Sequence, residues 1–152
     1  MTLPTVLLQI DADHTVLAVD GQPVAALPVG SRRTADQCFR QDPPRAIDIE
    51  RAIEVVEDQV MPWRARLPAG AVLVARDAGV HEIARLAGVD DMPHAELTLD
   101  ALERVFNRLA DVASGSPVAA SGLPVTPAFA ARLVILREAL HHLGFDRLRI
   151  EA

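Results

Sequence analysis

Three short apolar runs at the start of the chain limit its fold more than any other feature of the sequence. They cover residues 3–10, 16–19 and 23–29, and the polar segments DADH and DG separate them. Asp20-Gly21 is a strong signal for a two-residue β-hairpin turn, because both residues tolerate a positive φ. Runs of this length and spacing predict a three-stranded antiparallel meander.

After Gly30 the pattern changes to an alternation of helices and strands. Apolar residues recur at steps of three and four from about Ile47 to Met61, which predicts an amphipathic helix. The segment GAVLVAR (70–76) is apolar almost throughout, as is typical of a buried strand with parallel neighbours. Further helices are predicted at 80–88, after an N-cap at Thr98, and from Thr126-Pro127 to Gly144, before a last strand in RLRIEA.

This order of elements predicts a fold class. A meander followed by strand–helix–strand crossovers is the connectivity of the ribonuclease H-like fold. We therefore expect a single α/β domain over residues 1–152, with a mixed five-stranded sheet and helices on both faces. A chain of 152 residues is long enough to bury one hydrophobic core.

Charge and composition exclude several classes of function. The formal net charge is -6, and the 15 basic residues, all of them arginine, are scattered along the chain. Nucleic-acid binding depends on clustered positive charge, so we expect no nucleic-acid partner. The first apolar run lacks a basic flank and is too short to be a signal or membrane-spanning segment, so we expect no membrane partner and a cytoplasmic protein.

Acidic residues follow two strands that should lie side by side. Asp11 and Asp13 come directly after the first strand, and Asp77 follows the strand at 70–76. Carboxylates at such strand ends hold divalent metal ions in ribonuclease H-like nucleases, which makes these three residues a candidate metal site. The structural interpretation, which we favour, is that Asp11 and Asp13 form a solvated hairpin tip and that Asp77 caps the next helix.

Five phrases of the sequence correspond to phrases of a known family: QIDADHTVL (9–17), AALPVG (25–30), QDPP (41–44), RDAGVHEIA (76–84) and ARLVILREALHHLGFDRLRIEA (131–152). In that family they read D-I-G-G-G-S-T-E-L, S-L-P-L-G, DPP before a helix, V-G-G-T-A-T-T-L-A, and a last helix and strand like those here. The chain thus resembles the second lobe of the exopolyphosphatase/guanosine pentaphosphate phosphohydrolase (Ppx/GppA) family, a branch of the actin-like ATPase superfamily. The resemblance covers nearly the whole chain and implies a ribonuclease H-like lobe.

The residues that carry the family's chemistry differ in this chain. The phosphate loop Gly-Gly-Gly-Ser-Thr falls on Asp11, Ala12, Asp13, His14 and Thr15, of which only Thr15 matches. Glycines let backbone N–H groups approach an anion, whereas two carboxylates repel it. The family's acidic residue before the loop falls on Gln9, which cannot act as a general base. The second phosphate phrase falls on Asp77-Ala78-Gly79.

The resemblance therefore implies ligand-binding positions without a catalytic residue. These positions are Asp11, Asp13, His14, Thr15, Asp77 and Gly79. We expect a single-lobe pseudoenzyme that binds a ligand or a partner, either as a homo-oligomer or with a complementary lobe. One alternative is a divergent phosphatase or exopolyphosphatase whose second lobe comes from another chain. Another is a metal-dependent nuclease, and a divalent metal is the only cofactor that the residues suggest.

Overall fold

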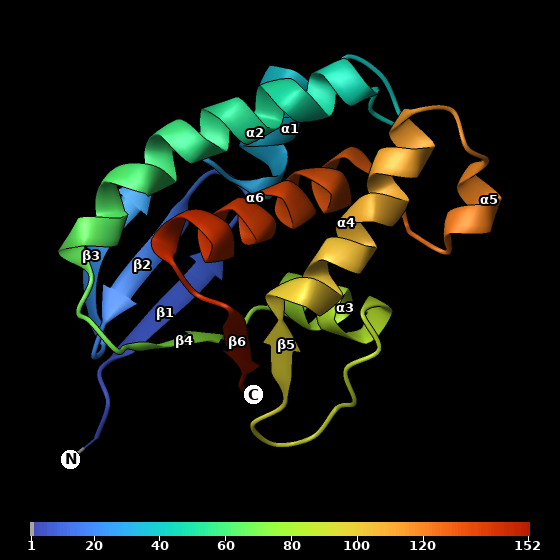
Figure 1. The fold of residues 1–152 in the computed structure, drawn as a ribbon. Helices are drawn as coiled ribbons and strands as arrows, with labels where there is room; N and C mark the ends of the chain where they lie inside the picture. The colour runs from blue at the N-terminus through green and yellow to red at the C-terminus, as the bar shows by residue number, and fades with distance from the viewer. Residues whose placement is uncertain (1) are drawn as a thin grey trace.

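The apolar runs at the N-terminus form the predicted meander. In a computed structural model that describes residues 2–152, β1 (Thr5–Ile10), β2 (Thr15–Val19) and β3 (Gln22–Leu27) pair antiparallel (Figure 1). Asp20 and Gly21 have φ values of 47° and 83°, as a two-residue hairpin between twisted strands requires. β3 is an edge strand, where the missing N–H of Pro23 is tolerated.

The complete sheet has six strands, one more than the sequence predicted. Its order is β3-β2-β1-β4-β6-β5, and β4 (Val72–Ala75) runs parallel to both β1 and β6 (Arg147–Ile150). The additional strand, β5 (Glu96–Thr98), pairs antiparallel with β6 at the other edge. It has three residues, of which only Leu97 is buried, so it contains no apolar run that could predict it.

Seven helical segments connect the strands in the described part of the chain. They are α1 (Ser31–Cys38), α2 (Ala46–Val60), the 3-10 helix η1 (Met61–Arg66), α3 (Ala78–Leu86), α4 (Leu99–Ala113), α5 (Val118–Ser121) and α6 (Pro127–Leu143). The hydroxyls of Thr98 and Thr126 accept hydrogen bonds from the N–H groups of Ala101 and Phe129, at 3.2 and 3.1 Å. Both predicted N-caps are therefore confirmed.

The helices lie on one face of the sheet, whereas the sequence predicted them on both. Figure 1 shows α6 against the sheet, and it contacts α1, α2, α3 and α4. From β1, Val6, Leu8 and Ile10 join the core that these helices form, while Leu7 and Gln9 between them lie outside it. The cause is connection handedness: the crossovers from β3 to β4 and from β4 to β6 move in the same direction across the sheet. Right-handed connections then place both sets of helices on the same side.

α6 is the centre of the hydrophobic core. Of its 17 residues, 11 are buried, so neighbouring elements cover the helix on all sides. Its N-terminal half brings Arg132 to Gly79 in α3, and its C-terminal half brings Glu138 and His142 to Glu57 in α2. Within residues 2–152, none of the helices combines the length and the apolar character that crossing a membrane requires.

Candidate functional site

The loop between β1 and β2 packs its backbone against the start of α1. The N–H of Ser31 donates a hydrogen bond to the Asp11 carbonyl at 3.0 Å. The N–H groups of Arg32 and Arg33 donate to the Ala12 carbonyl at 2.9 and 3.0 Å. The first amides of a helix have no partner within it and are a common anion-binding site. Here the carbonyls of the loop occupy them, so they are not available to a phosphate.

Two residues beside the loop fix this arrangement. Gly30 lies so close to the loop that a Cβ at this position would overlap the Ala12 carbonyl. Thr15 is fully buried, and its hydroxyl donates to the Val29 carbonyl at 2.9 Å. The only residue that matches the family's phosphate loop therefore ties β2 to the segment that leads into α1, and its hydroxyl is used in this buried contact.

The outer side of the loop is a surface of paired charges. Asp13 forms an ion pair with Arg32, and Gln9 donates a hydrogen bond to the Asp11 carboxylate at 2.9 Å. A shallow hollow of about 580 Å³ lies here, lined by Asp13, His14, Arg32, Arg33, Asp36 and Gln37. These contacts are typical of a solvated hairpin tip.

A second polar group lies at the carboxyl end of β4. Asp77 is the N-cap residue of α3, but its side chain makes no capping hydrogen bond, in contrast to the predicted cap. Both of its carboxylate oxygens are buried and have no side-chain or backbone partner within hydrogen-bond geometry. The buried Nε of Arg132 has no hydrogen-bond partner either. Burial raises the pKa of the Asp77 carboxyl, its own backbone N–H and the Arg132 guanidinium oppose this shift, and the charge of Asp11 adds to it.

Gly79 makes room for the arginine of this group. A Cβ at position 79 would overlap the Arg132 side chain, which crosses the start of α3. The glycine that corresponds to the family's second phosphate phrase therefore lies against a guanidinium. His81, two residues after Gly79, forms a hydrogen-bond contact of 2.8 Å between its Nε2 and the Glu151 carbonyl.

The structure brings the predicted residues together in part. The charge of Asp11 acts on Asp77, so the ends of β1 and β4 are neighbours, as the sequence predicted. Among the described residues, however, Asp11, Asp13 and Asp77 do not form a group of converging metal-ligand atoms. A divalent metal at this edge stays a prediction.

A further hollow of about 670 Å³ lies between α3, the loop at 89–95 and the end of β6. Charged side chains of both signs line it, Arg76 and Arg85 on one hand and Asp90, Asp91 and Glu151 on the other. This mixture selects neither anions nor cations. The sequence contains no indication of this hollow, because its lining residues lie in segments far apart in the chain and come together only in the folded structure.

The comparisons with known proteins identify the fold. No family model matches the sequence, and no curated protein sequence matches it. The crystal structure of the type II variant of the Aquifex aeolicus Ppx/GppA phosphatase matches with a TM-score of 0.78 at 15% identity, over 99% of this chain and 54% of that chain. The fold is that of one half of a Ppx/GppA structure.

A second solved structure leads to the same conclusion. An exopolyphosphatase from Cytophaga hutchinsonii matches with a TM-score of 0.72 at 10% identity, over 99% of this chain and 53% of that chain. The chain therefore spans about half the length of the solved structures that it matches. The ribonuclease H-like, actin-like lobe that the sequence resemblance implied is confirmed as the fold. At such low identities the likeness establishes the fold alone.

Proposed function

We propose that this chain is a non-catalytic Ppx/GppA-like lobe that binds a small ligand at the carboxyl end of its sheet, beside Asp77 and Arg132. The observation that carries the proposal is the Asp77 carboxylate, whose two buried oxygens have no hydrogen-bond partner, near an Arg132 Nε that also has none. Buried polar groups in folded proteins are nearly always hydrogen-bonded, and an unpaired one costs about 1–3 kcal/mol.

The chemistry of the Asp77 carboxylate and the Arg132 guanidinium indicates which hydrogen-bonding groups the ligand carries. The carboxylate accepts hydrogen bonds and the guanidinium donates them. A ligand with a hydroxyl or a primary amide satisfies both, because each of these groups donates and accepts. Arg132 is only half-buried, so its side chain can move aside and let the ligand reach Asp77.

The contacts of the β1–β2 loop support the absence of catalysis. Phosphoanhydride hydrolysis requires an oriented water and stabilisation of charge on the phosphoryl group. The α1 amides that could stabilise such charge bind the carbonyls of Asp11 and Ala12, and the Thr15 hydroxyl binds Val29. Gln9, at the family's acidic position, is bonded to Asp11.

One alternative is a partner chain with a complementary lobe. A second chain that supplied the other half of a Ppx/GppA structure would complete a two-lobe phosphatase or exopolyphosphatase. A homo-oligomer or a complementary lobe as partner, and a cytoplasmic location, stay predictions. The nuclease alternative loses support because Arg32 already neutralises Asp13, one of its three carboxylates.

Two measurements on the purified chain test the proposal. The first is hydrolysis of polyphosphate and of p-nitrophenyl phosphate, for which we expect no more release of phosphate by the wild type than by Asp77→Asn. Release that exceeds this background contradicts the non-catalytic role.

The second measurement is a thermal-shift screen with polyols, primary amides, nucleosides and inorganic phosphate as probes. We expect hydroxyl- or amide-bearing probes to raise the melting temperature of the wild type and of Asp58→Asn, an exposed aspartate on α2, but not of Asp77→Asn. A probe that stabilises Asp77→Asn as much as the wild type contradicts the assigned site.

A further inference from the structure

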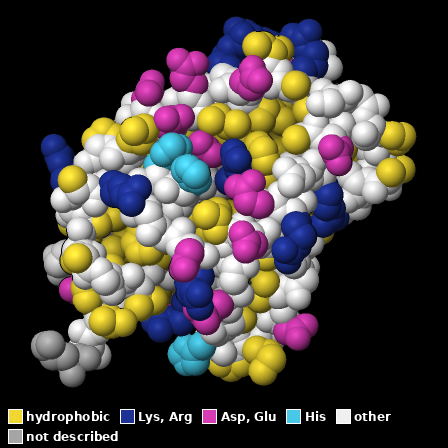
Figure 2. All heavy atoms as spheres, viewed as in Figure 1, with side chains coloured by type: hydrophobic (Ala, Val, Ile, Leu, Met, Phe, Trp, Pro, Cys, Tyr) yellow, Lys and Arg dark blue, Asp and Glu magenta, His cyan; other side chains and the backbone are white. Residues whose placement is uncertain are grey.

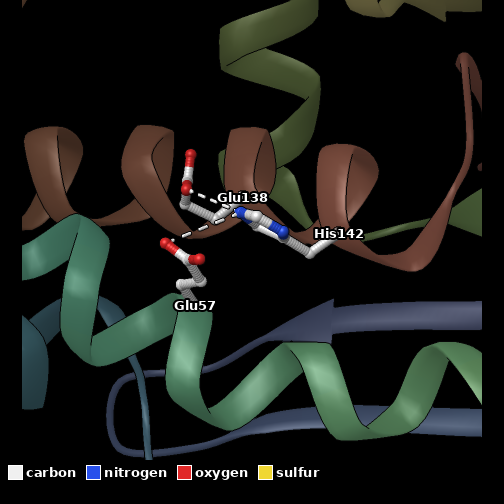
Figure 3. A group of neighbouring side chains, drawn as sticks. All are labelled: Glu57, Glu138 and His142. Carbon is white, nitrogen blue, oxygen red and sulfur yellow. Dashed lines mark hydrogen bonds and ion pairs between the residues drawn. The ribbon is translucent and has the colours of Figure 1, made fainter.

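Three side chains with metal-ligating atoms converge between α2 and α6. None of them belongs to the group of Asp77 and Arg132 at the carboxyl end of the sheet. Figure 3 shows Glu57 of α2 pointing toward Glu138 and His142 of α6. Glu138 and His142 are four residues apart, so they lie on one face of the helix. Figure 2 shows histidine and acidic side chains gathered on the surface near the C-terminal end of α6.

The distances between these atoms fit a metal ion with short bonds. His142 Nε2 lies 3.3 Å from Glu138 Oε1 and 3.9 Å from Glu57 Oε2, and all three ligand atoms lie within 4.8 Å of one another. Bonds of about 2.0–2.1 Å in tetrahedral geometry place neighbouring ligand atoms roughly 3.3 Å apart. The His142–Glu138 pair already has this spacing. The Glu57 side chain is 38% exposed and can move by the small distance that remains.

Further contacts hold the buried ligand in place. The other oxygen of Glu138, Oε2, accepts a hydrogen bond from Arg137 at 3.0 Å. Arg137 in turn donates to Glu103 of α4 at 2.7 Å, and its guanidinium lies over the Phe106 ring at 4.1 Å. Outer contacts of this kind orient metal ligands and strengthen binding.

The local charge favours a cation. With a neutral imidazole, the three carboxylates of Glu57, Glu103 and Glu138 exceed the single positive charge of Arg137. The Glu138 side chain is only 5% exposed, so its charge is poorly solvated. A cation bound to its Oε1 would stabilise it, since buried charges are paired or coordinate metals.

We propose that Glu57, Glu138 and His142 form a binding site for a first-row divalent transition metal ion such as Zn²⁺. One imidazole and two carboxylates suit this class, whereas Mg²⁺ prefers a shell of six oxygen ligands. His142 would ligate through Nε2, the ring nitrogen that lies 3.3 Å from Glu138 Oε1, with the imidazole proton on Nδ1. The ion links α2 to α6 and leaves a fourth position open to solvent.

The test is titration of the chelator-treated full chain with Zn²⁺ by calorimetry, and with Co²⁺ by visible absorption. We expect one Zn²⁺ per chain, weaker binding of Mg²⁺, a higher melting temperature with Zn²⁺, and Co²⁺ absorption bands of a site with fewer than six ligands. His142→Ala and Glu57→Gln should each weaken Zn²⁺ binding at least tenfold.

Two matched controls keep the test specific. His141→Ala changes the neighbouring histidine, which stacks edge-on against His142 but is not part of the ligand group, and Glu54→Gln changes an exposed glutamate of α2. Both should bind Zn²⁺ like the wild type. Glu57 is partly exposed, so Glu57→Gln tests the site even if a variant of buried Glu138 does not fold. The proposal is wrong if the wild type binds no Zn²⁺, if His142→Ala binds it unchanged, or if His141→Ala weakens binding equally.

Discussion

Two glycines near the carboxyl end of the sheet have neighbours of different rigidity. A Cβ at Gly30 would overlap backbone atoms of Ala12, whereas a Cβ at Gly79 would overlap the flexible end of Arg132. We expect Gly30→Ala to destabilise the protein by about 1–3 kcal/mol, as overpacking of a rigid site does. Gly79→Ala should cost less, because the arginine can move. Urea denaturation of both variants measures the difference, and equal losses would show that the loop is free to shift.

The raised pKa of Asp77 predicts a pH dependence of stability. Burial raises this pKa above the ordinary value of 3.8, so just above pH 3.8 the folded protein keeps a proton that the unfolded chain has released. The stabilisation from this group is therefore complete below pH 3.8 and is lost as the pH rises through the folded-state pKa. Asp77→Asn removes the titration. The free energy of unfolding of the wild type, relative to that of Asp77→Asn, should fall from pH 3.8 upward; a flat or rising difference contradicts the shift.

The sequence predicted where these residues lie better than what they contact. The placement of Asp11 and Asp77 at adjacent strand ends follows from strand order, which apolar runs reveal. The burial of Asp77 depends on Arg132, 55 positions later, and on the missing side chain at Gly79. Nor does any local pattern indicate that the Ala12 carbonyl points at the amides of α1. These contacts arise from tertiary packing, so the sequence predicted which strand ends are neighbours and not which groups their side chains contact.

At the scale of elements, the charged contacts of Arg137 connect α6 to α4. Arg137 pairs with Glu103 on α4 and with the buried Glu138, and it covers Phe106. Arg137→Ala leaves a buried carboxylate without its charge partner, which we expect to cost about 3 kcal/mol in metal-free buffer. Arg147→Ala removes exposed pairs with Asp146 and Glu96 and should change stability little. Urea denaturation compares the two, and similar midpoints would mean that Glu138 is well solvated.

The elements that the sequence predicted are those with a complete local signal. The turn at Asp20-Gly21, the caps at Thr98 and Thr126 and the helix end at Gly144 each depend on residues within one turn of the element. β5 could not be predicted, because its three residues become a strand only through pairing with β6. The helices lie on one face because successive parallel strands are placed in the same direction across the sheet. The apolar periodicity of a helix does not indicate this strand order.

At the scale of the whole molecule, one helix connects most of the structure. α6 contacts α1, α2, α3, α4, η1 and β1, and the described core is a single cluster that includes side chains of all but η1. Unfolding of α1 and α2 would therefore expose the core side chains of α6 that also pack against α3 and α4. The half-length match to the solved structures thus coexists with a hydrophobic core of the described residues on the helix side of the sheet.

This arrangement predicts that the chain unfolds as one cooperative unit. Trp63, the only tryptophan, lies in η1 and packs against the core, so its fluorescence reports on that end of the molecule. Far-UV circular dichroism reports on all helices together. Because both depend on α6, the two urea transitions should coincide. Leu136→Ala, at a fully buried position of α6, should move both urea transitions together and lower the free energy of unfolding by about 2–5 kcal/mol. Transitions that separate would mean that η1 and α2 unfold independently of the α4 side, and that α6 does not couple them.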